Sequence, residues 1–379
     1  MIECDFLVIG AGIAGAGAAY RLASHGSVVL LDMEEQAGYH TTGRSAAFYA
    51  ETYGGPMIQP LTTASKAFFH SPPAGFSDVP LVKTLGAIHI YRADQRAEAE
   101  RLYGELRAAL PNVERLNAHE VKARAPHIDT SGLLGGIADP DCGDLDVAAL
   151  HQGYLRAAKA MGVQILLDAR FDRAAHDGTH WRVITRKGTV RAGTVINAAG
   201  AWGDDVACRA GVAPLGLKPL RRTVVTLPKP HGLPYDRHGP VVLDIDEEFY
   251  FKPEGDGYLV TPADENPSVP CDAQPELEDV ARAVSCFEKA VGCTVVRITA
   301  KWAGLRTFGP DRTPVIGFAT DAPAFFWNVG QGGYGIQTSP AWSDLMAALV
   351  LRQALPAYLR EAGVRPETYS PARFVTEPA

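Results

Sequence analysis

The chain has 379 residues, of which 46% are hydrophobic, and a formal net charge of −7 at pH 7. A chain of this length and composition can bury a large core, which favours an enzyme built from two closely joined domains. Its acidic balance leaves no basic patch for nucleic acid or for an anionic membrane surface. No apolar run approaches the length that spans a bilayer, so we expect no transmembrane segment.

The six cysteines are scattered along the chain and include no C-x-x-C pair. This usage is typical of free thiols in a reducing cytoplasm and argues against a disulfide framework or a metal site. The N-terminus carries no basic leader or cleavage site, because its apolar residues already belong to the first expected strand. We therefore expect a cytoplasmic protein without a metal, with peripheral association at the inner membrane as a second option.

The N-terminal segment follows the order strand, glycine turn, helix, strand and acid. Cys4–Ile9 is an apolar strand, Gly10–Gly15 has the spacing G-x-G-x-x-G, and Asp32 follows a second apolar run at Val28–Leu31. A glycine-rich turn alone also occurs for purely structural reasons, but here every part falls at the spacing that a dinucleotide requires. Asp32 would bind the ribose hydroxyls, and the absence of a basic residue beside it disfavours a 2′-phosphate.

Each residue of the glycine turn has a physical role in this prediction. Gly10 allows the tight turn, Gly12 lets the backbone approach a pyrophosphate, and Gly15 lets the helix pack closely on the strand. Ile13 and Ala14 open the helix, whose free N–H groups and positive dipole end would point at the phosphates. We therefore expect all five residues in the cofactor site.

Beyond Asp32 the pattern is not that of a second nucleotide-binding half. Helices are expected at Leu61–His70, Gln95–Ala109, Ala148–Met161, Glu276–Val291 and Ser343–Gln353. Strands are expected at Val163–Leu167, Trp181–Thr185, Gly188–Ala192, Thr194–Trp202, Thr223–Leu227, Glu248–Lys252 and Phe325–Val329. This order predicts a cofactor domain built from residues 1–80, 140–220 and 305–379, and a substrate domain inserted as residues 81–139 and 221–304.

Over nearly its full length the chain resembles the D-amino-acid-oxidase-like FAD oxidoreductases, and among them the bacterial D-arginine dehydrogenases. The segments that carry the resemblance are Gly10–Gly15, Gly43–Ala47, Ala149–Arg156, Asn197–Trp202, Trp302–Arg306 and Gln331–Ser339. The first and fourth of these occur in many FAD proteins, whereas the last two are much more specific. The resemblance implies FAD rather than NAD, and a mixed α/β fold in which a Rossmann-like FAD-binding domain carries an inserted, strand-rich substrate-binding domain, as in glycine oxidase.

The resemblance also assigns cofactor contacts outside the glycine turn. Arg44, Ser45 and Ala46 would lie against the flavin and its pyrophosphate, and Ala199 and Gly200 would lie along the ribityl-phosphate chain. The plainer interpretations are that Arg44 is a solvated loop arginine and that Ala199 and Gly200 are an ordinary strand end.

A glycine-rich run after the last strand would face the flavin pyrimidine ring. The residues assigned there are Gly332, Gly333, Tyr334, Gly335, Ile336, Gln337 and Thr338, and Gly332 is also counted among the catalytic residues. Backbone N–H groups and a helix dipole at this position would stabilise the negative charge of a reduced flavin, although the same run could be only a flexible loop. No cysteine follows Cys293, so the C-terminal flavin–cysteine link of some relatives has no partner here and we expect noncovalent FAD.

The substrate site implied by the resemblance depends on two arginines. Arg222 and Arg306 occupy the positions that hold the substrate carboxylate, which arginine binds bidentately where lysine cannot. Tyr250 would add a hydrogen bond, and Tyr53 would lie on a mobile loop that covers the site. Arg221 should point to the opposite face of its strand and is left out of the site.

Three substitutions separate this chain from the D-arginine enzymes. The glutamate that pairs with the substrate guanidinium is replaced by Ala87, a histidine by Phe48 and a threonine by Ala50, which makes the predicted pocket more apolar. A buried guanidinium needs a charged partner, so the reason to prefer a cationic substrate is lost. Glu51 or His89 could restore polarity, although an exposed loop glutamate and a core or surface histidine are the plainer interpretations.

We therefore expect FAD-dependent oxidative deamination of D-amino acids with neutral or apolar side chains. Hydride would pass from Cα to flavin N5, and the imino acid would hydrolyse to a 2-oxo acid and ammonia. One alternative is oxidation of secondary amines, imino acids or 2-hydroxy acids, and another is a flavin-binding subunit without turnover. No side chain is an evident general base.

The electron acceptor is inferred from one strand. Oxidases of the family place a lysine beside flavin N5, and the comparable segment here, Gly257–Ala263, contains no lysine. The resemblance therefore favours a dehydrogenase that passes electrons to a quinone or another carrier over an oxidase that produces hydrogen peroxide.

Overall fold

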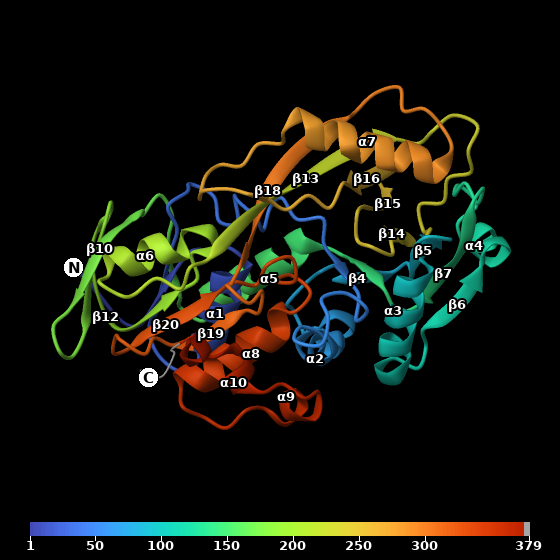
Figure 1. Ribbon diagram of the computed structural model, residues 1–379. Coiled ribbons are helices and arrows are strands. Elements are labelled where there is room, and N and C mark those ends of the chain that lie inside the picture. Colours follow the sequence, from blue (N-terminus) through green and yellow to red (C-terminus); the bar gives the residue numbers. More distant parts are fainter. Residues whose placement is uncertain (375–379) are drawn as a thin grey trace, which may run out of the picture.

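The computed structural model describes residues 1–374, in which two large sheets and a small third sheet are joined by helices (Figure 1). The helices are α1 (Ile13–Leu22), α2 (Gln59–His70), α3 (Arg96–Ala109), α4 (Ala118–Arg124), α5 (Val147–Ala160), α6 (Gly203–Arg209), α7 (Leu277–Val291), α8 (Ser339–Val350), α9 (Ala357–Glu361) and α10 (Pro366–Tyr369). Short 3-10 helices occur at Gly200–Trp202 and Pro371–Phe374. In this part of the chain, no helix has the length and apolar character needed to cross a membrane.

The first large sheet has the strand order β10-β11-β12-β1-β2-β9, and β20 pairs with both β12 and β19. Its strands are β1 (Ile2–Ile9), β2 (Val28–Leu31), β9 (Gln164–Leu166), β10 (Phe171–His176), β11 (Trp181–Thr185), β12 (Gly188–Asn197), β19 (Val315–Phe318) and β20 (Phe325–Val329). Strand β1 runs parallel to both β2 and β12. Central parallel strands are buried on both faces, which explains the continuous apolar run of β2.

Strand β12 differs from the prediction in its extent. The segments predicted as Gly188–Ala192 and Thr194–Trp202 form one strand, which pairs with β1 along most of its length and ends at Asn197. The next residue passes very close to the glycine turn, since a β-carbon at Gly10 would lie 2.5 Å from the Ala198 carbonyl oxygen. The close approach brings the end of β12 and the start of α1 together at one edge of the sheet.

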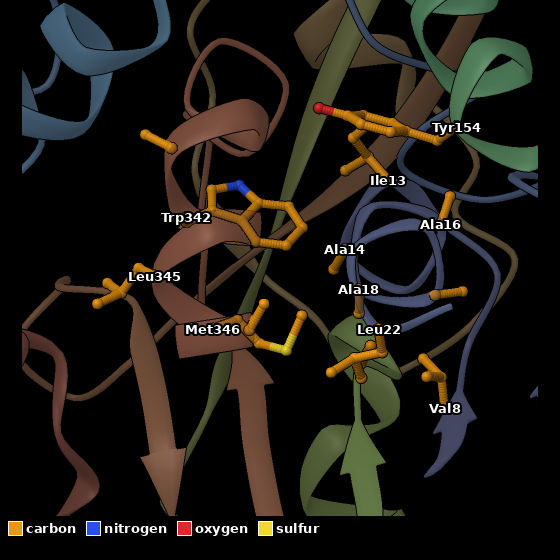
Figure 2. Packing of buried hydrophobic residues seen from close by; sticks show 14 of the residues in the cluster. Val8, Ile13, Ala14, Ala16, Ala18, Leu22, Tyr154, Trp342, Leu345 and Met346 are labelled. Carbon is orange, nitrogen blue, oxygen red and sulfur yellow. The ribbon is translucent and has the colours of Figure 1, made fainter. Parts of the chain in front are cut away.

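Helix α1 packs through small residues into the core formed with α5 and α8 (Figure 2). Ala14 and Ala18 of α1 and Trp342 of α8 belong to this buried cluster. The two helices approach so closely that a β-carbon at Gly17 would meet the Ser343 hydroxyl at 2.2 Å. Dense packing of this kind fixes the helix in place, so the position of its N-terminus is well defined.

The second large sheet has the order β17-β13-β16-β15-β14-β5-β7-β6, and β18 pairs with β13. Its strands are β5 (Ala87–Arg92), β6 (Glu114–Asn117), β7 (Leu133–Asp139), β13 (Lys218–Pro228), β14 (Val241–Asp244), β15 (Tyr250–Glu254), β16 (Gly257–Thr261), β17 (Asn266–Pro267) and β18 (Ala300–Phe308). Helix α7 lies along the outer side of this sheet in Figure 1.

Side chains of the second sheet alternate between two apolar clusters. Val225 and Phe251 pack with Phe287 of α7, whereas Val224 and Tyr250, which precede them by one residue, belong to a separate cluster on the other face. This is the period of two that a strand imposes. The face away from α7 is therefore the one that meets the remainder of the molecule.

The small sheet has the order β3-β8-β4 and consists of β3 (Phe48–Tyr49), β4 (Val82–Thr84) and β8 (Gly143–Leu145). Strands of the first large sheet come from residues 2–31, 164–197 and 315–329, and those of the second from residues 87–139 and 218–308. The limits of the two expected domains stay a prediction. Helix α8 begins at Ser339, one turn before the expected Ser343, with a proline in its first turn. The other expected helices occur with their ends shifted by at most two residues.

Candidate active site

A cavity of about 610 Å³ lies between the two large sheets. Its wall includes the carboxyl ends of β1 and β2 and the start of α1 on one side, and residues of β13 and β18 on the other. In open α/β sheets ligands bind outside the carboxyl ends of the strands. The cavity is therefore where the fold would hold a cofactor together with a substrate.

Most of the predicted site residues line this cavity. On the wall are Gly10, Gly12, Ile13, Ala14, Asp32, Arg44, Ser45, Ala46, Phe48, Tyr53, Ala199, Gly200, Arg222, Tyr250, Arg306, Gly332, Gly333, Gly335, Ile336 and Gln337. The predicted residues that lie off the wall are Gly15, Ala50, Ala87, Tyr334 and Thr338.

The glycine turn has the geometry that the sequence predicts. Gly10 has a φ of +101°, which favours glycine, and a β-carbon at Gly15 would lie 1.7 Å from the Gly10 carbonyl oxygen. Gly15 thus acts through close packing of helix on strand. Gly12 is the N-cap of α1 and provides no side-chain cap for the first turn of the helix. A helix N-terminus of this kind favours negative charge such as phosphate.

Asp32 lies at the end of β2, on the cavity wall. Its carboxylate accepts hydrogen bonds from the backbone N–H groups of Ala11, at 2.6 Å, and Glu34, at 2.9 Å. Burial raises the pKa of this carboxyl group, and the two N–H donors act in the opposite direction. The side chain is fixed beside the glycine turn, where a ribose would lie.

Arg44 lies on the wall, but its guanidinium is directed at the protein. It donates hydrogen bonds to the carbonyl oxygens of Ala273, at 2.9 Å, and Ala303, at 3.1 Å, and forms an ion pair with Asp272. Trp302 in turn donates its indole N–H to the Arg44 carbonyl oxygen at 3.0 Å. The side chain thus links the loop to the second sheet, and its expected contact with the flavin and its pyrophosphate stays a prediction.

The two predicted clamp arginines lie together at the other end of the cavity. Arg306 is partly buried and donates from Nη1 to the Tyr53 hydroxyl at 2.9 Å. Within residues 1–374, no carboxylate forms an ion pair with Arg306. Arg222 is buried and donates from Nε to the Asp264 carbonyl oxygen at 2.8 Å. Burial, followed by the positive charge of Arg306, lowers the pKa of the Arg222 guanidinium.

The carboxylate next to Arg222 is shared with another arginine. Glu265 Oε1 lies 3.4 Å from Arg222 Nη2 and 2.8 Å from Arg312 Nη2. Glu247 is the other acidic group near the pair; burial raises the pKa of its carboxyl, and the positive charges of Arg306 and Arg222 act in the opposite direction. With Glu265 shared and the charge of Glu247 disfavoured by burial, the two arginines are only partly neutralised. Such a site favours an anion, and a planar carboxylate matches the geometry of guanidinium donors.

Arg221 points to the opposite face of β13, as the alternation of the strand predicts. It forms ion pairs with Glu276, at 2.6 Å, and Asp279, at 3.6 Å. Both partners lie at the start of α7. This arginine is therefore absent from the cavity wall and belongs to the contact between sheet and helix.

Three aromatic rings form an apolar wall beside the arginines. The Phe48 ring centroid lies 5.3 Å from that of Tyr250 and 5.6 Å from that of Tyr53. Tyr250 donates its hydroxyl to the Ala46 carbonyl oxygen at 3.4 Å, and burial raises its pKa, so it stays protonated at neutral pH. Together these rings exclude water from the arginine end of the cavity.

Ala50 and Ala87 lie behind this wall, which differs from the prediction that they line the pocket. Both are buried in the cluster that contains Phe48, and the ring of Phe48 faces the cavity. Glu51 and His89 are also off the wall. Glu51 pairs with Lys66 at 3.0 Å, so it does not supply a free charge to the cavity.

Side chains of the run after β20 contact the loop that carries Tyr53, while the expected contact of its backbone with the flavin stays a prediction. Gln337 accepts the Ala50 N–H at 3.1 Å and donates to the Tyr53 carbonyl oxygen at 3.4 Å. The ring of Tyr334 packs on that of Tyr53, with 5.0 Å between centroids, and its carbonyl oxygen accepts the Thr338 hydroxyl at 2.8 Å. These side chains support the loop that carries Tyr53.

Sequence reasoning missed several polar residues on the wall, among them Glu34, Thr42 and Thr307. The hydroxyl of Thr307 is buried and has no hydrogen-bond partner, although the residue lines the cavity next to Arg306. Buried hydroxyls normally have partners, so an unpartnered one at the edge of a cavity is unusual. A threonine within a strand gives no signal in the sequence that would identify it.

The donor set fits a flavin dinucleotide. The glycine turn and the helix N-terminus beside it suit a pyrophosphate, with the Ile13 N–H of the first turn held by the Thr42 hydroxyl at 2.9 Å. Cys271 also lines the wall, so a cysteine lies at the cavity even though none follows Cys293. Over the described residues, no group of three or more His, Cys, Asp and Glu side chains is arranged to hold a metal.

Comparison with known proteins gives the family. A family model described as FAD dependent oxidoreductase matches residues 5–349. The mitochondrial dimethylglycine dehydrogenase of Rattus norvegicus is 26% identical over 269 residues, which cover 69% of this chain and only 31% of that enzyme.

Solved structures agree on the fold. Glycine oxidase from Geobacillus kaustophilus superposes with a TM-score of 0.86 at 20% identity, covering 99% of this chain and 100% of that one. L-Proline dehydrogenase from P. horikoshii superposes with a TM-score of 0.82 at 21% identity, covering 98% of each chain. The predicted mixed α/β fold is thus confirmed. Because the family model matches most of its length, the chain belongs to the FAD dependent oxidoreductases, and its cofactor is FAD.

Proposed function

We propose that the protein oxidises small amino acids at the carbon that bears the nitrogen, with neutral or apolar D-amino acids as the favoured substrates. The single observation that supports this most strongly is the pair Arg222 and Arg306 beside an apolar wall. The pair accepts one carboxylate, and the wall accepts an uncharged side chain. Relatives named for dimethylglycine, glycine and proline act on compounds that combine a nitrogen with a carboxylate.

The arginines would hold the substrate carboxylate through charge-assisted hydrogen bonds. Arg306 has only the Tyr53 hydroxyl as a side-chain partner within the described residues, so its remaining N–H groups are available. Tyr53 and Tyr250 lie on either side of Phe48 and would enclose the substrate. Holding the carboxylate at two points orients the neighbouring Cα. Correct orientation of the reacting carbon raises the rate of hydride transfer.

FAD supplies the hydride acceptor for this reaction. Tyr250 keeps its proton at neutral pH and Phe48 has none to exchange, while the Glu265 carboxylate near Arg222 is already paired with two arginines. The amine proton therefore passes to water, or the substrate enters with its amine already neutral. The imino acid formed hydrolyses to a 2-oxo acid and ammonia.

Selection against cationic side chains follows from what surrounds Phe48. The residues packed with it are alanine, tyrosine, valine and leucine, together with one cysteine. Glu51 could have replaced the carboxylate that is lost at position 87, but it is already paired with Lys66. A guanidinium or ammonium placed here would lack a partner, which is costly in an apolar environment.

Oxidation of secondary amines or imino acids is the second candidate. Two relatives are named for such compounds, dimethylglycine and L-proline. The carboxylate clamp serves these substrates equally well, and the fold accommodates enzymes named for an L-amino acid, so the preference for the D form rests on the resemblance described above. Both candidates predict flavin reduction by a carboxylate-bearing amine.

We further propose that the enzyme is a dehydrogenase rather than an oxidase. The buried strand β16 carries Leu259 on the face that packs with Tyr250, and it contains no lysine. A quinone or another carrier would then accept the electrons. The cavity wall draws on both groups of strands, which supports the proposed division into FAD-binding and substrate-binding domains.

The test is anaerobic flavin reduction by a panel of candidate substrates. Holoenzyme would be mixed in a stopped-flow instrument with the D and L forms of leucine, phenylalanine, arginine and proline, and with glycine, sarcosine and D-lactate. Fast bleaching by D-leucine or D-phenylalanine supports the first candidate, and fast bleaching by sarcosine or proline supports the second. Bleaching by D-lactate alone, or by none of these compounds, would contradict the proposal. Oxygen consumption against dye reduction with the best substrate then separates oxidase from dehydrogenase.

A further inference from the structure

We propose that Thr52, together with His89 and Asp139, forms a latch that holds Tyr53 in position against Arg306. This inference rests on the proposed function, because the role of Tyr53 in enclosing the substrate belongs to it. The three residues are called the Thr52 latch below. None of them lines the cavity, so the latch acts through Tyr53 and its members are positioning residues.

The latch is a chain of two hydrogen bonds with a defined direction. Thr52 Oγ1 donates to Asp139 Oδ2 at 3.2 Å, which uses the only hydrogen of the hydroxyl group. The His89 Nε2 atom, 3.4 Å from the same oxygen, must therefore be the donor in the second contact. Burial lowers the pKa of His89 to about 4, so the ring is neutral at pH 7, and the direction of the hydrogen bond then assigns its proton to Nε2. Its Nδ1 atom has no partner.

The latch joins the loop to the second sheet. Thr52 lies in the loop of residues 50–58 between β3 and α2, here called the Tyr53 loop. His89 lies on β5 and Asp139 on β7, and these two strands are direct neighbours in the second sheet. Thr52 is therefore the point at which a loop from outside the sheet is bound to it.

Burial makes the latch costly to open. Thr52, His89 and Asp139 are at most 7% exposed. The other oxygen of the Asp139 carboxylate accepts the Asp141 N–H at 3.0 Å, and in the part of the chain that the structure describes no cation is paired with Asp139. A buried carboxylate that lost the Thr52 hydroxyl would be left poorly satisfied.

The latch lies immediately before the residue it positions. Tyr53 follows Thr52 and accepts a hydrogen bond from Arg306 at 2.9 Å, and the next residues, Gly54 and Gly55, have φ values of +106° and +72°. The loop is therefore bound on the N-terminal side of Tyr53 and has a permissive backbone on the other side. With the latch broken, the loop would keep its contacts with Gln337 and Tyr334 but lose its link to the second sheet, so Tyr53 would be held less firmly.

Thr52→Val tests the latch, because valine keeps the shape of threonine and removes the hydroxyl. Thr52→Ser is the conservative variant that retains the donor. The matched control is Thr185→Val, since Thr185 is also buried and its hydroxyl, like that of Thr52, makes two contacts. It donates to the Gly188 carbonyl oxygen at 2.9 Å and accepts the Lys187 N–H at 3.2 Å, away from the cavity wall.

Two readouts are measured on the holoenzyme. The first is hydrogen–deuterium exchange of the peptide that spans the Tyr53 loop, which needs no substrate. The second is the dissociation constant of benzoate, a simple carboxylate, from its perturbation of the flavin absorbance. We expect Thr52→Val to speed exchange in the loop and to weaken benzoate binding about tenfold, whereas Thr52→Ser and Thr185→Val stay within about twofold of the parent.

A double-mutant cycle with Tyr53→Phe shows whether the latch acts through Tyr53. In the Tyr53→Phe background, Thr52→Val should add no further loss of benzoate affinity. An equal loss in both backgrounds would overturn the proposal in favour of general destabilisation, and unchanged loop exchange in Thr52→Val would overturn it directly. If instead benzoate does not bind the parent while the loop exchange still responds, the proposed carboxylate site fails and the latch stands.

Discussion

The guanidinium of Arg306 lies against the backbone of Gly333, where a β-carbon would come within 2.7 Å of Nη1 and 2.8 Å of Cζ. Gly333 belongs to the turn after β20, and Arg306 belongs to β18. Because real β-carbons do not approach other atoms so closely, any side chain at this position must displace the guanidinium. The glycine thus sets the position of one of the two clamp arginines.

Gly333→Ala should therefore weaken carboxylate binding about tenfold or more, which corresponds to about 1.4 kcal/mol. Titration of the holoenzyme with benzoate, followed by flavin absorbance, measures the effect. Gly104→Ala is the control, since a β-carbon at Gly104 in α3 meets nothing within 4 Å. Benzoate affinity that is equal in Gly333→Ala and the parent would show that Arg306 does not bind the carboxylate.

Replacement of either clamp arginine by methionine should slow flavin reduction severely and leave FAD bound. The loss of one charge-assisted contact is expected to cost about 2–5 kcal/mol in binding and positioning. Arg221→Met is the matched control, because Arg221 lies next to Arg222 on β13 but points to the opposite face, where it pairs with Glu276. The comparison is made by stopped-flow reduction at low substrate concentration. Normal reduction in Arg222→Met or Arg306→Met would remove that arginine from the clamp.

Ala87→Glu should destabilise the protein and fail to improve the oxidation of D-arginine. Ala87 is buried behind Phe48 and lies opposite Asp139 in the antiparallel pair of β5 and β7. A glutamate there would be an unpaired buried charge next to a like charge, which costs about 3 kcal/mol or more. Urea unfolding and kcat/KM for D-arginine check both parts. A stable variant with raised D-arginine activity would show that position 87 faces the substrate.

FAD should be released intact by acid or heat, and the protein should keep its unmodified mass. The sequence supports this through the lack of a cysteine after Cys293, but the cavity wall contains Cys271, whose thiol lies 3.6 Å from the Ser268 hydroxyl. Mass spectrometry of the parent and of Cys271→Ser distinguishes noncovalent FAD from a flavin linked to Cys271. A flavin adduct in the parent that Cys271→Ser abolishes would contradict noncovalent attachment.

Stability should fall as the pH drops from about 6.5 towards 4, partly because of His127. Its ring is buried against Tyr258, and burial lowers the pKa of the imidazole from 6.5 to about 4. Between these values the unfolded chain binds a proton that the folded chain does not, so unfolding is favoured as the pH falls. At about 1.4 kcal/mol per pKa unit, this group lowers stability by about 2 kcal/mol between pH 7 and pH 5.

His127→Phe should reduce that pH dependence, whereas replacement of the exposed His231 by phenylalanine should leave it unchanged. Urea unfolding at both pH values, with excess FAD, provides the comparison. Burial also lowers the pKa of His89, so the variant keeps the part of the pH dependence that comes from His89. An identical pH dependence in His127→Phe and the parent would show that folding does not lower the pKa of His127.

The parts of the site that could be predicted depend on short-range patterns. Gly10, Gly15 and Asp32 follow from spacing along one strand–turn–helix unit, and the opposite directions of Arg221 and Arg222 follow from the period of a strand. These features need no knowledge of the tertiary structure, since neighbouring residues determine them.

The parts that could not be predicted depend on segments that meet only in the folded chain. Arg44 was assigned to the pyrophosphate, but its partner Asp272 comes from a segment more than two hundred residues away. Ala87 lies behind Phe48 because two sheets pack there, and Thr52 meets Asp139 because the loop after β3 lies against the second sheet. Spacing along the chain carries no information about such contacts.

The central claim is that Arg222 and Arg306 hold the carboxylate of an amine substrate next to the flavin. Its most direct test compares the best substrate of the panel with its carboxamide in anaerobic flavin reduction. The two compounds have nearly the same shape and differ in the negative charge. We expect the amino acid to reduce the flavin at least about a hundredfold more efficiently, as the loss of a charged contact implies. Equal rates for acid and amide would contradict the carboxylate clamp.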